Sequence, residues 1–168
     1  MIIHNRFGDE IWERKIDDLS KFSDKDFYEE LPDVTEKVKN CKNVLEAIKI
    51  RFKNNIIGSE IDVDEEFWRT KIIVKDNIVF FPEKNAWMLD LRFEVPDQFG
   101  GKVTARFSEN VFLSQAESGK ELFDEAKPNT IYIDFYYNPP ANIKDRCKIL
   151  NELRVIAKYY GYKVNVFG

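Results

Sequence analysis

The sequence predicts a single-domain α+β fold over 1–168, with N-terminal helices, then a mostly antiparallel mixed sheet and a C-terminal strand-helix-strand unit. Two observations predict it. Apolar residues recur every three or four positions over about 9–54, as in helices, and every second position over much of 60–168, as in strands. A chain of 168 residues that is 43% apolar and 14% aromatic also has enough hydrophobic material for one sizeable core.

The helical part predicts three helices. Apolar stripes place the first over about 9–22 and a second, shorter one over about 23–31. Pro32 marks the boundary that follows, because proline disfavours helical geometry in the residue before it. The third helix covers 33–53 or 35–53, and it carries lysine and arginine residues away from its apolar stripe.

A hairpin is expected where the apolar period changes from helical to alternating. Two runs, 68–75 and 78–81, flank the pair Asp76 and Asn77. Asp and Asn tolerate the left-handed conformations that a two-residue turn requires. Both faces of these runs are apolar, so we expect this strand pair to be covered on both sides.

The next two expected strands are 87–95 and 102–108, and the first of them has the cleanest alternation in the chain. The residues expected to face the core are Trp87, Leu89, Leu91, Phe93 and Val95, and those expected to face outward are Met88, Asp90, Arg92 and Glu94. Within 102–108, alternate apolar residues again define an inward face.

Charge selects the register between these two strands. Opposite charges placed across neighbouring strands stabilise a sheet by about 0.2–1 kcal/mol, and like charges cost a similar amount. We therefore predict the register that sets Asp90 opposite Arg106. It also sets Glu94 opposite Lys102. The competing register would instead set Arg92 opposite Arg106.

The C-terminal part predicts a short helix and then a strand-helix-strand unit. The short helix lies within 118–127 and begins with a capping box. The aromatic and β-branched run 130–137 favours a strand. It precedes a helix over 141–160, for which Asn142 suits the N-cap, and a final strand over 162–167. A helix of this length permits a right-handed crossover between parallel strands.

The net charge of −4 is unevenly distributed along the chain. Residues 1–36 carry a net charge of −6, residues 37–54 carry +5, and residues 60–66 contain five acids. An acidic chain is a poor non-specific binder of nucleic acid, because neutralisation of phosphates dominates that affinity.

Cysteine usage and hydropathy indicate a cytoplasmic protein. Cys41 and Cys147 both fall on apolar helical stripes, which is typical of free thiols in a reducing compartment. The sequence contains neither a secretory leader nor a run of about twenty apolar residues, so we expect no membrane insertion.

Recognisable catalytic motifs are absent from the sequence. His4 is the single histidine, and Ser-His-Asp or Cys-His catalysis would depend on it. One histidine and two distant cysteines do not make a zinc site. The run Ser118-Gly119-Lys120-Glu121 lacks the earlier glycine and the following Ser or Thr of a phosphate-binding loop. We therefore expect a protein that is not an enzyme and needs no cofactor.

Protein binding is the function that the sequence favours. The segment 60–68 combines five acids with two aromatic residues, and an acidic rim around aromatic anchors suits recognition of a basic protein. The leading hypothesis is an immunity, antitoxin or host-factor-inhibitor protein that occludes a basic or nucleic-acid-binding surface of its partner. The proposed partner-binding residues are Glu60, Asp62, Asp64, Glu65, Glu66 and Trp68.

Three alternatives stay open. Strand carboxylates could hold Mg²⁺ in a phosphodiesterase or nuclease, and the candidate metal ligands are Asp62, Asp64, Asp90 and Asp134. A small-ligand-sequestering protein is the second alternative, since a pocket is a tertiary feature. Direct nucleic-acid binding is the least favoured, and it would use the basic helical stripe with Tyr132 and Tyr136 as stacking platforms. Tyrosines near the C-terminus leave a homo-oligomeric contact open as well.

Overall fold

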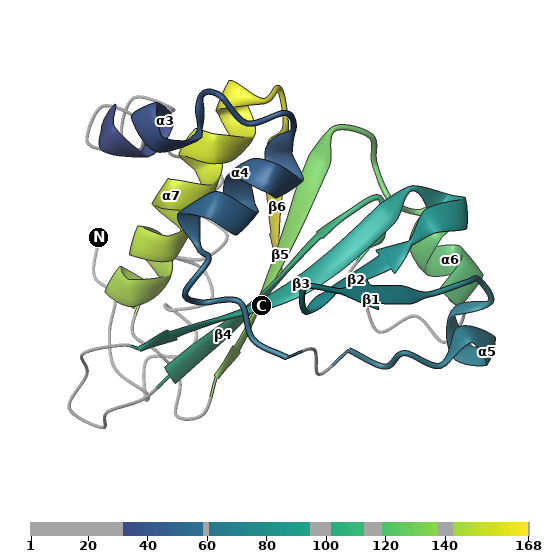
Figure 1. Cartoon of the computed structure of the whole chain (residues 1–168). Coiled ribbons are helices and arrows are strands. Elements are labelled where there is room, and N and C mark those ends of the chain that lie inside the picture. Colours follow the sequence, from purple (N-terminus) through teal and green to yellow (C-terminus); the bar gives the residue numbers. More distant parts are fainter. Residues whose placement is uncertain (1–31, 59–60, 95–101, 113–118, 138–142, 168) are drawn as a thin grey trace.

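The computed structural model describes residues 32–58, 61–94, 102–112, 119–137 and 143–167, and these residues form an α+β fold (Figure 1). The helices are α3 (Pro32–Val38), α4 (Val44–Arg51), α5 (Glu65–Trp68), α6 (Gly119–Asp124) and α7 (Ile143–Tyr159), with a 3-10 helix, η2 (Pro82–Lys84). The strands are β1 (Ile73–Lys75), β2 (Ile78–Phe81), β3 (Ala86–Glu94), β4 (Lys102–Glu109), β5 (Thr130–Tyr137) and β6 (Lys163–Phe167). The two helices expected within 9–31 lie outside the described residues, as does Asn142.

The six strands form one sheet in which every strand lies beside its neighbour in the sequence, in the order β1-β2-β3-β4-β5-β6. The first four strand pairs are antiparallel, and β5 and β6 are parallel. Helix α7 makes the crossover between β5 and β6. The sequence prediction of a C-terminal strand-helix-strand unit is therefore confirmed, with β5 covering all of 130–137.

The predicted register between β3 and β4 is also confirmed. Asp90 lies opposite Arg106, and Glu94 lies opposite Lys102. The Arg106 guanidinium donates to both carboxylate oxygens of Asp90, at 2.8 Å from Nε and 3.4 Å from Nη2. Arg92 lies opposite Thr104, so the competing register with two facing arginines is not formed.

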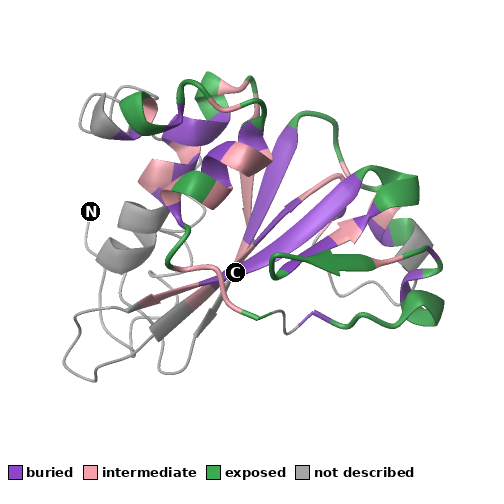
Figure 2. Ribbon diagram, in the orientation of Figure 1, coloured by how far each residue is buried: buried purple, intermediate pink, exposed green. Residues whose placement is uncertain are grey.

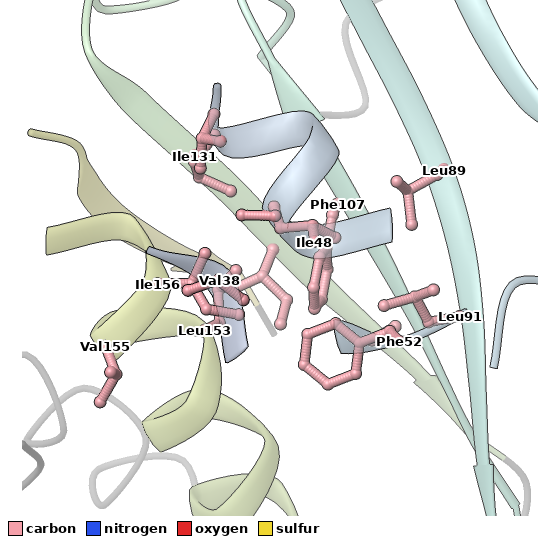
Figure 3. Packing of buried hydrophobic residues seen from close by; sticks show 14 of the residues in the cluster. Val38, Ile48, Phe52, Leu89, Leu91, Phe107, Ile131, Leu153, Val155 and Ile156 are labelled. Carbon is pink, nitrogen blue, oxygen red and sulfur yellow. The ribbon is translucent and has the colours of Figure 1, made fainter. Parts of the chain in front are cut away.

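The first core fills the space between one face of the sheet and helices α3, α4 and α7 (Figure 3). Phe52, which follows α4, lies at its centre, where its ring meets Phe93 and Phe107 edge to face at 5.6 and 6.0 Å. The fully buried residues around it include Val38 of α3, Ile48 of α4, Leu89 and Leu91 of β3, Ile131 of β5, and Leu153 and Ile156 of α7.

A second, smaller core covers the opposite face of the sheet beside α5 and α6. It contains Trp68, Val79, Phe81, Met88, Leu122 and Tyr132. The outward assignment of Met88 and Asp90 was therefore wrong, because their side chains are 2% and 0% exposed. The alternation within β3 was correct, but both of its faces are covered, and Figure 2 shows the middle strands as buried.

The hairpin of β1 and β2 forms around Asp76 and Asn77, which both have positive φ, at 53° and 64°. The expectation that both strands of this hairpin are covered on both faces is wrong for β1. β2 is buried on both faces, but Ile73 and Val74 of β1 are 43% and 51% exposed, because β1 lies at the sheet edge outside both cores. The first strand is also shorter than 68–75, since Trp68 ends the one-turn helix α5.

The single helix expected over 33–53 is two helices, α3 and α4, and this prediction was wrong. Asn43 is the N-cap of α4, and its side chain accepts a hydrogen bond from the Glu46 amide at 2.9 Å. In return, the Glu46 carboxylate accepts from the Lys42 amide at 2.8 Å. Backbone amides at the start of a helix have no partner within the helix, and these two hydrogen bonds supply acceptors for them. A new helix can therefore begin after Asn43, although the apolar spacing continues through the break.

Helix α7 reinforces the break between α3 and α4. The Tyr160 hydroxyl donates to the carbonyl of Val38 and lies 2.9 Å from the carbonyl of Cys41. The Tyr159 hydroxyl donates to the carbonyl of Lys39 at 3.3 Å. Burial raises the pKa of Tyr160, which keeps this phenol protonated as a donor. Carbonyls at and just after the end of α3 thus have partners in Tyr159, the last residue of α7, and in Tyr160, which follows it.

The Asn43 cap predicts a local stability contribution. Asn43→Ala should lower the free energy of unfolding by about 0.5–2 kcal/mol, because the Glu46 amide loses its acceptor at the α4 N-terminus. Urea denaturation followed by circular dichroism measures the loss. Asn40→Ala, at an exposed position in the same connection, is the matched control. An equal loss in both variants would contradict a capping role for Asn43.

Glu109 joins the end of β4 to the C-terminal strand-helix-strand unit. Its carboxylate accepts from the Trp87 indole at 2.7 Å and from the Tyr162 hydroxyl at 2.6 Å. Burial, together with the hydrogen bond and charge of Glu109, raises the pKa of Tyr162 to about 12. The phenol therefore holds its proton more tightly in the folded chain than at its ordinary pKa of 10.0.

The hydrogen bond between Tyr162 and Glu109 predicts a loss of stability at alkaline pH. Between pH 10 and 12 the unfolded chain releases the Tyr162 proton and the folded chain retains it, so the folded state binds more protons and the free energy of unfolding falls as pH rises. Tyr162→Phe should make that fall shallower. Urea titrations at several alkaline pH values measure it, with Tyr159→Phe, which removes an exposed phenol, as control. An unchanged pH slope in Tyr162→Phe would contradict the assignment.

Candidate functional site

The acidic segment singled out in the sequence is fixed by hydrogen bonds to its own backbone. Asp64 is the N-cap of α5 and accepts from the Glu66 amide at 2.9 Å. Asp62 accepts from the Asp64 amide at 2.9 Å. The Glu65 carboxylate accepts from the Ile72 amide at 3.3 Å, just before β1. Acids in the first turn also favour the positive end of a helix, so the sequence Asp-x-Asp-Glu-Glu suits this short α5.

Trp68 anchors the segment to the second core. Its side chain is 6% exposed and packs against Phe81, with ring centroids 5.0 Å apart, and against Phe123 of α6 at 6.1 Å. The indole nitrogen donates to the Asp62 carbonyl at 2.5 Å. Trp68 thus fixes the acidic segment to the second core, and little of its own side chain is accessible to a partner.

We define the α5 surface as the exposed residues Asp62, Val63, Asp64, Glu65, Glu66 and Phe67. Val63 and Phe67 are 50% and 42% exposed, and they lie among four exposed acids (Figure 2). Glu60, the remaining acid of the predicted site, lies outside the described residues. The aromatic residue available at this surface is Phe67, which sequence reasoning did not separate from its buried neighbour Trp68.

Exposed apolar side chains gather at this corner of the molecule. Among the described residues, the large hydrophobic side chains that are exposed are Ile50, Val63, Phe67, Ile73, Val74 and Tyr159. Four of the six lie between positions 63 and 74: Val63 just before α5, Phe67 in α5, and Ile73 and Val74 in β1. A concentration of apolar side chains next to acids is the composition expected of a protein-interaction surface.

The strand carboxylates proposed as metal ligands have a different environment. The pairing of β3, β4 and β5 places Arg106 between Asp90 and Asp134 on one face of the sheet. The fully buried Asp90 carboxylate forms an ion pair with Arg106. Asp62 and Asp64 instead belong to the hydrogen-bonded turn before α5. Within the part of the chain that the structure describes, no three His, Cys, Asp or Glu side chains are grouped to hold a metal ion.

Tyr132, proposed as a base-stacking platform, is part of the second core. Its side chain is fully buried, its hydroxyl accepts from the Lys127 amide at 2.8 Å, and its ring meets Phe112 edge to face at 5.4 Å. Tyr132 therefore presents no face on which a base could stack. Tyr136 lies four residues further along β5.

Comparison with known proteins gives no relative. No protein family, curated protein or solved structure matches the chain. No helix in the described ranges has the length and apolar character needed to span a membrane.

The buried ion pair predicts unequal roles for the two aspartates beside Arg106. Asp90→Ala should lower the free energy of unfolding by about 3–5 kcal/mol, because removing one partner leaves a desolvated guanidinium without that counter-charge. Asp134→Ala, at a half-buried position, should cost less. Urea denaturation of both variants measures the difference. Equal losses, or a negligible loss in Asp90→Ala, would show that the pair does not stabilise the sheet.

Proposed function

We propose that this protein is a non-enzymatic binding protein that recognises a basic protein partner through the α5 surface. In binding, it would cover a basic or nucleic-acid-binding surface of that partner, as immunity proteins, antitoxins and host-factor inhibitors do. The observation that carries the proposal is the exposure of four acids around Val63 and Phe67 on one short hydrogen-bonded segment. A reducing, cytoplasmic setting is part of the proposal, supported by the free thiol of Cys41.

Charge supplies the specificity of such a surface. Four carboxylates within five residues attract a basic partner and speed the encounter, and they repel acidic proteins. Val63 and Phe67 supply apolar area that the partner would remove from water. The combination of apolar contacts at the centre and charges at the rim matches the general composition of protein interfaces.

Rigidity supports the same proposal. Asp62, Asp64 and Glu65 each accept a backbone hydrogen bond, and Trp68 ties the segment to the second core. A surface that is already ordered loses less conformational entropy when it binds, so more of the contact energy appears as affinity.

The test neutralises acids while preserving their hydrogen bonds. The triple variant Asp62→Asn, Glu65→Gln, Glu66→Gln removes three charges, keeps acceptor oxygens, and leaves the N-cap Asp64 intact. We expect association with the partner captured from the native cell to slow by about tenfold or more at low ionic strength, because electrostatic steering is lost. Quantitative mass spectrometry identifies the captured partner, and stopped-flow mixing with that partner measures the rate.

A control variant with the same change in net charge distinguishes the effect of the α5 acids on the association rate from the effect of the overall charge. Glu121→Gln, Asp124→Asn and Glu125→Gln remove three exposed acids at α6. This variant should retain nearly all of the association rate. Equal slowing by both triple variants would attribute the effect to net charge, and an unchanged rate in the α5 variant would refute the proposed surface.

A further inference from the structure

The edge strand β1 is exposed on both of its faces. Ile73 shares a sheet face with Phe80 and the first core, and Val74 shares the other face with Val79 and the second core. Their side chains are nevertheless 43% and 51% exposed. Exposed apolar side chains on an edge strand make a template on which another strand can pair.

The geometry of the hairpin determines which backbone groups face outward. A two-residue turn at Asp76 and Asn77 makes Lys75 and Ile78 a hydrogen-bonded pair. Hydrogen-bonded and non-hydrogen-bonded pairs alternate along an antiparallel ladder, so the pair of Val74 and Val79 is non-hydrogen-bonded. The N–H and C=O of Val74 therefore point away from β2, toward the open side of the sheet.

The neighbouring outward N–H is already used within the chain. Ile72 has the same orientation as Val74, and its amide donates to the Glu65 carboxylate at 3.3 Å. This hydrogen bond caps the edge where it meets α5. The outward-facing groups of Val74 thus form the centre of the pairing edge, and Glu65 of the α5 surface lies at one end of it.

Charge distinguishes the two faces of this edge. Lys71 and Lys75 alternate with Ile73 on the face of the first core, and both lysines are exposed. Ile72 and Val74 lie on the opposite face, the side of the second core to which α5 is anchored. A strand that pairs here would match best with acidic side chains toward the lysines and with apolar or basic side chains toward the α5 surface.

We propose that the partner adds a short antiparallel strand to β1, centred on Val74, with acidic residues toward Lys71 and Lys75. The inference rests on the proposed function, and it adds the mode of recognition, which is β-strand addition. The partner is then basic where it meets the α5 surface and acidic along one side of its pairing strand. A second copy of this chain fits poorly, because two-fold pairing at Val74 would bring four lysines together on one face.

A synthetic peptide tests the edge directly. The probe is an extended peptide with the central sequence Glu-Val-Glu-Lys, in which valine faces Val74, glutamates face Ile73 and Lys75, and lysine approaches Glu65. Amide shifts in NMR spectra of the full chain should change at β1. Exchange of the Val74 amide proton should slow roughly fivefold at about four-fifths saturation, since only the free fraction exchanges.

Two control peptides separate strand pairing from charge attraction. Methylation of the central valine nitrogen keeps the sequence and charge but removes a ladder donor, and it should abolish Val74 protection. The charge-swapped sequence Lys-Val-Lys-Glu should bind more weakly, although a chain with net charge −4 would favour it on overall charge alone. Equal binding by the three peptides, or the absence of shifts at β1, would overturn the proposal.

Capture of the native partner by two different variants tests strand addition separately from the proposed function. Lys75→Glu should weaken capture of that partner at least about tenfold if strand addition is correct, because acidic residues would meet a carboxylate. Capture that depends on the α5 acids but is unchanged in Lys75→Glu would overturn strand addition alone. Val74 protection that rises with protein concentration, without any peptide, would show that a second copy occupies the edge and would also overturn the proposal.

Discussion

The ion pair between Asp90 and Arg106 holds the register on which the two cores depend. It lies between the two central strands β3 and β4, and the Asp90 carboxylate is fully buried. A shift of one residue between these strands would exchange their faces, moving Leu89 toward the second core and Met88 toward the first. A shift of two would keep the faces but bring the charges of Arg92 and Arg106 together. The buried carboxylate therefore costs desolvation, but it favours one register over both alternatives.

The position of the α5 surface follows from that register. Met88 lies on the second face beside Val79 of β2. Tyr132 of β5 lies on the same face, on the far side of Ser108 of β4, and belongs to the same core as Trp68 and Leu122 of α6. Burial of Trp68 then fixes the turn at Asp62 through the indole hydrogen bond. Trp68, two residues after Glu66, is buried, and the acids before it are exposed, so the same packing that stabilises the second core presents the charges to solvent.

The sequence contained enough information for the local elements and their order, but not for the second core. Periodicity and turn residues predicted β2 to β6 and α7, since these signals are local, and charge pairing predicted the register at Asp90. The outward assignment of Met88 failed because coverage of the second face comes from α5 and α6, which lie distant in sequence. The break before Asn43 was missed because its apolar spacing continues through it. Phe67 and Trp68 are adjacent and similar, so only tertiary packing decides which of them is exposed.

The edge strand β1 is protected against pairing with a second copy of this chain but is open to pairing with a strand of suitable charge. Short length and flanking lysines are devices by which proteins discourage pairing between identical edges, and Lys71 and Lys75 have that effect on a second copy of this chain. The same lysines attract a strand with acidic residues in alternate positions, and the apolar side chains of Ile73 and Val74 remain exposed between them. Glu65 contributes to both adjoining surfaces, because its carboxylate caps the Ile72 amide while it belongs to the acidic rim. A partner strand on β1 would therefore end beside the α5 surface, which makes one continuous interface of the strand edge and the acidic segment.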